Sequence, residues 1–347
     1  MKIYLDGKDN VGWSMDIERK NIQNALQRLH LKEVRFWGSA NIVHNIWWNR
    51  ILHPKFFFIR QKKNILVTTS NFINLNDDEY SLRNEFEKVT KIAKAWVVPS
   101  TKQKKIFDAY GILSHYQPFY LNFNLFKPSQ FDQNKKIIKK YLIPQSIISD
   151  KIIIASFQRD SLGTNLSSPK WQKGPDILID ILKTMPKDKF ILLLAGPRRH
   201  YVINECRKFN IPYYYMGKET NTDDALINSI NINDMPELYS FIDIYMVTSK
   251  SEGGPKAIME ATAMKKFILS TDVGIASDFL EPDNVFSSIS DYKKKLFDIL
   301  TGYDSNSIQS MMKMNIDKQY SKCLELLSFN AMDKRLLNIY QSILNDN

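Results

Sequence analysis

The sequence has 347 residues, which is enough for two domains of ordinary size. An apolar fraction of 44% and a charged fraction of 24% predict a folded chain, and the modest content of 12 Gly and 13 Pro excludes a collagen-like or low-complexity protein. The 48 Lys and Arg outnumber the 37 Asp and Glu, and the net charge of +11 favours an anionic partner such as nucleic acid, a lipid surface or a phosphorylated substrate.

The hydrophobic pattern predicts strands alternating with helices in the first part of the chain. The predicted strands are 2–5, 65–68 and 95–98, and the predicted helices are 16–29, 80–95 and 101–110. A segment from Phe126 to Ser129 resembles a linker, and a Lys-rich helix is expected at 132–142.

The same alternation continues beyond this linker. Strands are predicted at 152–157, 190–195, 244–248 and 267–270, and helices at 175–185, 234–241, 255–264 and 321–344. The first two of these strands are continuous apolar runs, as expected for parallel strands covered on both faces. The sequence therefore predicts two doubly wound α/β sheets, with a ligand in the cleft between the domains.

One strand-to-helix turn carries the clearest functional signal. Gly253 and Gly254 have no Cβ, so a ligand can approach their backbone amides closely. Pro255 then begins a helix, whose free N–H groups and partial positive charge suit a diphosphate.

Two glutamates flank this turn. Glu252 precedes the helix, and Glu260 lies two turns along it with a side chain that leans back toward the N-terminus. Carboxylates suit sugar hydroxyls because each accepts several hydrogen bonds. The alternative is a plain turn in which Glu260 pairs with Lys256 on a solvated face.

The segment from Glu252 to Glu260 resembles the E-x7-E signature of retaining GT-B glycosyltransferases, family 4 in particular. The resemblance implies two Rossmann-like α/β domains facing a central cleft. Residues 1–128 would bind the acceptor, residues 129–330 would bind the nucleotide-sugar donor, and a C-terminal helix at about 331–347 would rejoin the first domain.

The resemblance also implies roles for individual residues. Glu252 would be catalytic and contact the donor sugar, and Glu260 would bind the ribose. The diphosphate would be held by the turn and by two cations, namely Gly253, Gly254, Pro255, Lys256, Arg159 and Lys173. Thirteen residues separate Arg159 from Lys173, more than is usual in the family. Gly196 and Ile232 would lie near the base.

The N-terminal part matches the family less well. Gly12 occupies the first loop, where the family places a glycine near the donor and acceptor. Gly12 and Trp13 would therefore lie at the acceptor cleft, although Trp13 departs from the common pattern. His44 fits either a catalytic histidine of the cleft or a structural histidine at a strand end.

The positive charge is concentrated in the same N-terminal part. Residues 1–128 contain 20 of the 48 Lys and Arg but only 11 of the 37 Asp and Glu, so they carry +9 of the net +11. Residues 35–63 interleave aromatic and basic side chains, a combination that suits an anionic membrane surface. Some of these aromatics, Phe56 to Phe58 in particular, could instead be core residues.

The resemblance implies a retaining, metal-independent glycosyltransferase that moves a sugar from a nucleotide sugar, expected to be a UDP-sugar, to a hydroxyl of a glycan or lipid-linked oligosaccharide. No resident cofactor or metal is expected. Analogy favours bacterial surface polysaccharide synthesis (O-antigen, lipopolysaccharide or capsule) in the cytoplasm, peripheral on the inner face of the plasma membrane. The alternatives are a non-catalytic or epimerase-like GT-B protein and, less favoured because no nucleic-acid module is present, a nucleic-acid-binding protein.

Overall fold

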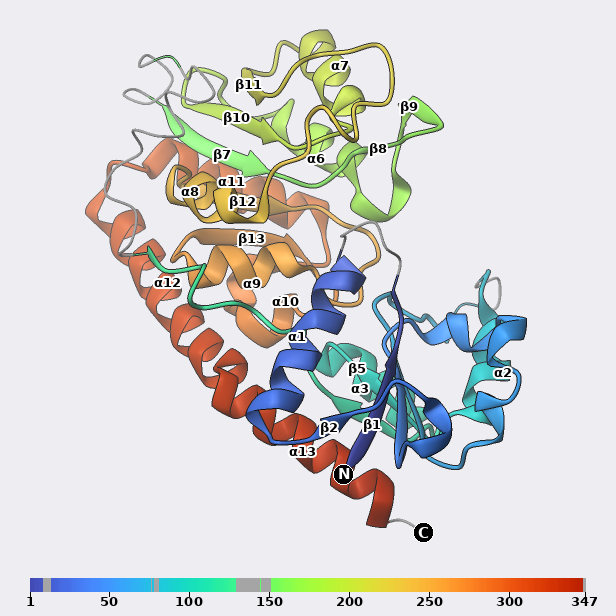
Figure 1. The fold of residues 1–347 in the computed structure, drawn as a ribbon. Helices are drawn as coiled ribbons and strands as arrows, with labels where there is room; N and C mark the ends of the chain where they lie inside the picture. The colour runs from blue at the N-terminus through green and yellow to red at the C-terminus, as the bar shows by residue number, and fades with distance from the viewer. Residues whose placement is uncertain (9–13, 76, 78–80, 129–143, 145–150, 346–347) are drawn as a thin grey trace. The chain divides into compact units, whose positions relative to one another are not determined.

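The computed structural model describes residues 1–8, 14–75, 77, 81–128, 144 and 151–345. The chain divides into two compact units (Figure 1). Unit 1 comprises Met1–Tyr120 together with Glu325–Asn347, and unit 2 comprises Leu121–Leu324. The linker predicted at 126–129 begins inside unit 2, and the helix predicted at 132–142 lies outside the described residues.

Unit 1 contains a parallel sheet in the order β2-β1-β3-β4-β5-β6. Its strands are β1 (Lys2–Asp6), β2 (Lys32–Glu33), β3 (Ile42–Asn45), β4 (Ile65–Thr68), β5 (Ala95–Val98) and β6 (Ser114–Tyr116). Its helices are α1 (Ser14–Arg28), α2 (Arg83–Ile92), α3 (Thr101–Ala109) and α13 (Phe329–Asn345). Four short 3-10 helices lie between Trp37 and Gln61.

The core of unit 1 explains the aromatic content of this part of the chain. Trp48 and Trp96 are fully buried, and Trp96 packs against Phe86 and Phe107 with ring centroids 5.0 and 5.5 Å away. Phe56 is also buried, whereas Phe57 and Phe58 are 58% and 62% exposed. The run of three phenylalanines therefore serves both the core and the surface.

The helix predicted at 321–344 is two helices. α12 (Asn306–Leu327) ends before Ser328, whose hydroxyl accepts a hydrogen bond from the Ala331 amide at 3.4 Å and so begins α13. α13 is joined to α1 because the Arg28 guanidinium donates two hydrogen bonds to the Asp333 carboxylate at 2.6 and 2.8 Å.

Unit 2 contains a second parallel sheet, in the order β11-β10-β7-β12-β13-β14. Its strands are β7 (Ile152–Ser156), β10 (Phe190–Ala195), β11 (Tyr213–Met216), β12 (Ile244–Val247), β13 (Phe267–Thr271) and β14 (Val285–Phe286). Its helices are α6 (Pro175–Leu182), α7 (His200–Lys208), α8 (Met235–Ser240), α9 (Lys256–Ala263), α10 (Ala276–Phe279), α11 (Ile289–Gly302) and most of α12. The predicted apolar strands are confirmed, since β7, β10, β12 and β13 are buried along their whole lengths.

A small antiparallel hairpin fills the long spacer noted between Arg159 and Lys173. It consists of β8 (Ser161–Leu162) and β9 (Asn165–Pro169), and the 3-10 helix η6 (Trp171–Lys173) follows it. The two ends of the hairpin lie side by side, because the Lys170 amide donates to the Asp160 carbonyl at 2.7 Å.

Candidate functional site

The sheet order of unit 2 indicates where a ligand can bind. From the central strand β7 the chain goes first to β10 and β11 on one side, and then returns to β12 on the other. Ligands of such sheets bind beyond the carboxyl ends of the strands at this reversal point. Arg159 lies just beyond the end of β7, and Glu252 follows the end of β12. Arg159 and Glu252, both predicted to bind the donor, thus lie just beyond the ends of the two strands that flank the reversal point.

Glu252 and Lys173, which are 79 positions apart in sequence, form an ion pair through Oε1 of the glutamate. The Ser249 hydroxyl lies 3.1 Å from the same oxygen and 2.9 Å from Oε1 of Gln158. The side chains of Lys173 and Glu252 are only 27% and 15% exposed. The carboxylate is therefore held by Lys173 from a distant segment and by Ser249 from its own loop, and Gln158 in turn contacts Ser249.

The turn that bears Lys173 packs directly on the end of β12. Gly174 has a φ of +54°, and a Cβ at this position would lie 1.9 Å from the Thr248 carbonyl oxygen. The Lys250 amide donates to the Gln172 carbonyl at 2.9 Å, and the Lys250 ammonium pairs with Asp176 at 2.5 Å. The two loops interlock, so the position of Lys173 relative to Glu252 is fixed by backbone contacts.

The glycine turn before α9 is buried, and the backbone at Gly274 packs against it. Gly253, Gly254 and Pro255 are all buried, and α9 begins at Lys256, one residue later than predicted. Gly274 has a φ of +50°, and a Cβ there would approach the carbonyl oxygens of Gly253 and Glu252 to 2.7 and 2.8 Å. The turn is thus packed against neighbouring backbone before any ligand arrives.

Positive charge gathers at this edge of unit 2. Burial, followed by the charge of Arg198, lowers the pKa of Arg159, while Asp223 opposes this effect. Burial also lowers the pKa of Lys170, and the charges of Arg159 and Lys173 lower it further. Lys170 is a cation that the sequence analysis missed, and the long Arg159–Lys173 spacing was the signal that an extra element enters here. An anionic ligand would relieve the repulsion among these groups.

Glu260 lies on α9 and contacts α8. The Tyr239 hydroxyl donates to Oε2 of Glu260 at 3.0 Å, and burial raises the pKa of this carboxyl even though Tyr239 and Lys256 oppose the shift. This geometry replaces the predicted alternative of a simple solvated pair between Glu260 and Lys256.

Gly196 directly follows β10 and has a φ of +82°, and the nearest atom to a Cβ there would be Cδ1 of Ile230, 3.9 Å away. Ile232 is the first residue of the 3-10 helix η7 (Ile232–Asp234) and is 41% exposed. The segment 230–232 therefore approaches Gly196, which is buried, while Ile232 itself stays partly exposed.

Residues 164–306 match the family model described as glycosyl transferases group 1. This range includes Lys173, Glu252 and Glu260 but neither Arg159 nor His44. No curated protein sequence matches the chain.

The structural similarity spans both units. HepE from Anabaena, solved in complex with UDP and glucose, aligns with a TM-score of 0.69 and 14% identity over 99% of this chain and 100% of that one. Sucrose-phosphate synthase from Thermosynechococcus elongatus aligns with a TM-score of 0.73 and 12% identity over 100% of both chains. A glycosyltransferase from Rickettsia africae aligns with a TM-score of 0.67 and 16% identity over 100% of this chain and 99% of that one.

The chain has the GT-B fold. The predicted fold class is thereby confirmed. In this GT-B chain, no helix among the described residues is both long and apolar enough to cross a membrane. The same residues contain no cluster of His, Cys, Asp and Glu that could hold a metal ion.

His44 lies inside unit 1 of the GT-B fold. Its side chain is 1% exposed, its Nδ1 lies 2.9 Å from the Tyr340 hydroxyl, and its Nε2 lies 2.8 Å from the Thr68 hydroxyl. Both ring nitrogens therefore have partners within the unit, an environment that favours the structural alternative, and the catalytic role of His44 stays a prediction. Gly12 and Trp13 lie outside the described residues.

We expect His44 to make the stability of unit 1 depend on pH. Burial lowers the pKa of His44 to about 3 from its ordinary value of 6.5, so between these values the unfolded chain binds a proton that the folded chain does not. The stabilisation is complete above pH 6.5 and is lost as the pH falls. Urea unfolding followed by tryptophan fluorescence should show a loss of about 2 kcal/mol between pH 7 and pH 5.

The variant His44→Gln should flatten this dependence, since the replacement does not titrate. His53→Gln, which changes an exposed histidine of the same unit, should leave the dependence as it is. Equal slopes in the wild type and His44→Gln would contradict the assignment.

Proposed function

We propose that this protein is a glycosyltransferase that moves a sugar from a nucleotide sugar to a hydroxyl group with retention of the anomeric configuration. The observation that supports it most is the convergence of Glu252, Lys173 and the buried glycine turn at the reversal point of the donor-side sheet. The bond between the anomeric carbon and the diphosphate breaks during transfer, and negative charge accumulates on the leaving group. Fixed cations and a helix N-terminus stabilise such charge.

The proposed roles follow from these positions. Arg159, Lys173 and the turn before α9 bind the diphosphate, Glu252 contacts the donor sugar, and Glu260 binds the ribose from its position beside Tyr239. Gly196 and Ile232 flank the base. No metal ion is required in this proposal, because protein cations and backbone amides occupy the role that a metal fills elsewhere. We propose UDP as the nucleotide, since HepE was solved with UDP.

A panel of nucleotide sugars tests the proposal directly. Each candidate is scored first by its effect on the melting temperature and then by the release of free nucleoside diphosphate with and without acceptor. One donor should stabilise the protein, and diphosphate release should require an acceptor. A protein that binds none of the nucleotide sugars or nucleoside diphosphates would not be a glycosyltransferase of this kind.

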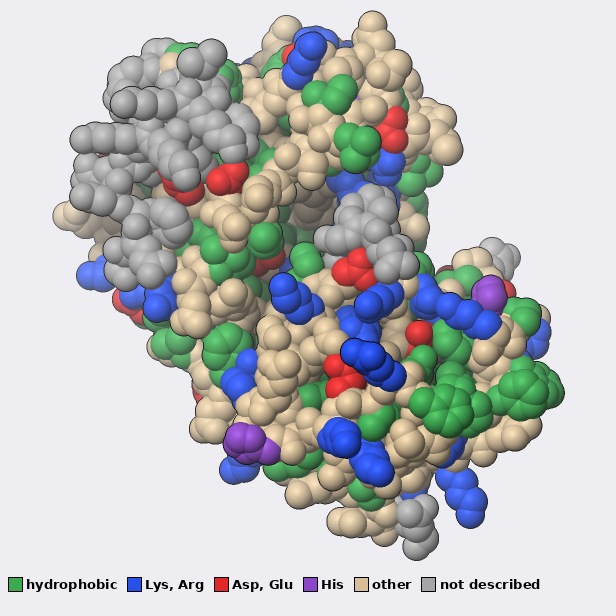
Figure 2. All heavy atoms as spheres, in the orientation of Figure 1, with side chains coloured by type: hydrophobic (Ala, Val, Ile, Leu, Met, Phe, Trp, Pro, Cys, Tyr) green, Lys and Arg blue, Asp and Glu red, His purple; other side chains and the backbone are tan. Residues whose placement is uncertain are grey.

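We further propose that unit 1 meets an anionic membrane, where a lipid-linked acceptor for bacterial surface polysaccharide would be presented. The basic aromatic surface is formed by exposed residues of one segment, namely Arg35, Phe36, Lys55, Phe57, Phe58 and Lys63. The rings of Phe57 and Phe58 lie 5.6 Å apart in an edge-to-face arrangement. Figure 2 shows hydrophobic side chains beside Lys and Arg on this face of unit 1. Exposed rings with cations nearby suit lipid headgroups.

Replacement of Phe57 and Phe58 together by Ser should weaken binding to phosphatidylglycerol-containing vesicles by about tenfold or more, because two partly inserted rings are lost. Vesicle sedimentation at low salt measures this. The matched control replaces Leu226 and Ile227, which are 92% and 62% exposed in unit 2, and should bind as the wild type does. Equal losses in both variants, or equal wild-type binding to neutral vesicles, would contradict this surface.

A further inference from the structure

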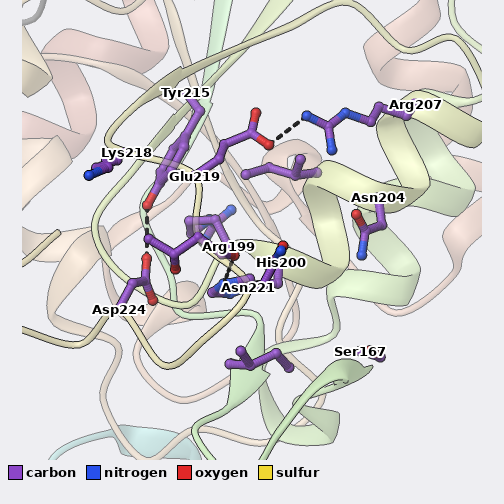
Figure 3. Close-up of a pocket in the computed structure, with 13 residues that line it drawn as sticks. Ser167, Arg199, His200, Asn204, Arg207, Tyr215, Lys218, Glu219, Asn221 and Asp224 are labelled. Carbon is purple, nitrogen blue, oxygen red and sulfur yellow. Dashed lines mark hydrogen bonds and ion pairs between the residues drawn. The ribbon is translucent and has the colours of Figure 1, made fainter. Parts of the chain in front are cut away.

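Unit 2 contains a cavity of about 240 Å³ that none of the proposed donor-binding residues lines. It lies among β9, the first two turns of α7, the end of β11 and the loop at 218–224 (Figure 3). Its lining includes no part of the glycine turn, and it does not include Arg159, Lys173 or Glu252. Since a water molecule occupies about 30 Å³ of the liquid, the space suits a small organic molecule.

Arg199, which lines this cavity, has a buried guanidinium without hydrogen-bond partners among the described residues. Its side chain is 1% exposed, yet Nε, Nη1 and Nη2 form no hydrogen bond with any described residue. Its ion pair with the buried Asp160 is long, with 3.6 Å between Nε and Oδ2. A buried guanidinium has five N–H donors, and leaving them unsatisfied is costly. A ligand that accepts several hydrogen bonds would satisfy them.

The backbone before Arg199 is held in a costly conformation. Arg198 has a φ of +60°, which lies in a backbone region that residues other than glycine rarely adopt. Its amide donates to Oδ1 of Asp224 at 2.7 Å, and its carbonyl accepts from the Asp160 amide at 3.0 Å. Strain that is fixed by contacts on both sides marks functional positions more often than others. Here it sets the direction from which Arg199 enters the cavity.

The charges around the cavity favour an anion. The two lining carboxylates are already engaged, Glu219 by Arg207 at 2.5 Å and Asp224 by hydrogen bonds from the Tyr215 hydroxyl and the Asn228 amide. Lys218 is exposed and has no ion pair with any residue that the structure describes. The cavity therefore offers Arg199 and Lys218 to a ligand and no carboxylate that remains unengaged.

A histidine adds a requirement for the ligand. Nε2 of His200 lies 3.0 Å from the Thr220 carbonyl and so carries the proton in the neutral ring, whereas the buried Nδ1 has no partner among the described residues. Nδ1 is then an acceptor for a hydroxyl group.

We propose that this cavity is a second binding site, which takes a small hydroxylated oxyanion, either a phosphate monoester or a carboxylate, with the Arg199 guanidinium as its anchor. Guanidinium groups match both oxyanions through paired hydrogen bonds. The ligand is distinct from the nucleotide sugar, because none of the proposed donor-binding residues lines this cavity.

Calorimetric titration of the full chain tests the site with three probes: glycerol 3-phosphate, malate and inorganic phosphate. Arg199 also lines a small cavity together with Arg159 and Lys173, so an anion could enter there instead. Each titration is therefore repeated with saturating UDP. We expect at least one probe to bind with unchanged affinity when UDP is present. Tighter binding of glycerol 3-phosphate than of malate assigns a phosphate monoester, and the reverse assigns a carboxylate.

The key variant is Asn204→Trp, which introduces a large ring from an exposed lining position on α7 and leaves Arg199 intact. It should weaken binding of the probe at least about tenfold. Arg199→Gln should do the same where it folds. Lys173→Ala should weaken the binding of UDP and leave the binding of the probe unchanged.

The proposal is overturned if no probe binds the wild type at millimolar concentration, if UDP displaces the probe, or if Asn204→Trp binds as tightly as the wild type. Failure of UDP to bind would instead count against the donor site and would leave the test of this cavity intact.

Discussion

Glu252→Gln is expected to reduce kcat by about a hundredfold or more with the donor identified by the nucleotide-sugar panel. Glutamine keeps the size of the side chain and can still accept a hydrogen bond from Ser249, but it removes the charge that pairs with Lys173. Removal of a single preorganised electrostatic contact at a reacting centre typically costs two to three orders of magnitude in rate. Initial-rate measurements of nucleoside diphosphate release give the result.

The matched control for this variant is Glu281→Gln. Glu281 is similar to Glu252 in burial, with 19% of its side chain exposed, and it also pairs with lysine, at 3.1 Å from Lys322 and 3.3 Å from Lys318. It lies outside the proposed donor site, so its replacement should leave kcat within about twofold of the wild-type value. Both variants should melt close to the wild-type temperature. Activity of Glu252→Gln equal to that of Glu281→Gln would remove Glu252 from the mechanism.

The central strands could be predicted from the sequence because burial on both faces produces continuous apolar runs. β7 and β10 are such runs, and their bounds in the structure differ from the prediction by one residue at most. β11 was missed because it lies at the edge of the sheet, where Tyr213 to Tyr215 are only partly buried and interrupt the apolar pattern. The strand order itself depends on contacts that no local pattern reports.

The candidate site shows the same division. Glu252 and Lys173 were each identified from local motifs, but their ion pair depends on the packing of Gly174 against Thr248 and could not be read from either motif. The environment of His44 was equally hidden, since its partner Tyr340 lies 296 positions away, on a helix at the other end of the chain. Local sequence thus identified chemically suitable residues, and tertiary contacts decided which of them meet.

Gly174→Ala is expected to lower the free energy of unfolding of unit 2 by at least about 3 kcal/mol. The added Cβ would lie 1.9 Å from the Thr248 carbonyl oxygen, and the backbone would have to keep a φ of +54°. Neither side of this contact is a flexible side chain, so the turn before α6 must separate from the end of β12. Lys173 precedes the glycine directly and would move with it.

Gly196→Ala provides the comparison within the same unit. Gly196 also has a positive φ, +82°, but the nearest atom to its Cβ would be 3.9 Å away, so this variant should lose only the roughly 1 kcal/mol of backbone preference. Hydrogen exchange of peptides covering β7, β10 and β12 measures the opening of unit 2 in both variants. Equal losses would mean that the contact between the turn and β12 is looser than the structure shows. A much larger loss in Gly174→Ala, together with weaker UDP binding, would mean that this backbone contact is what holds Lys173 beside Glu252.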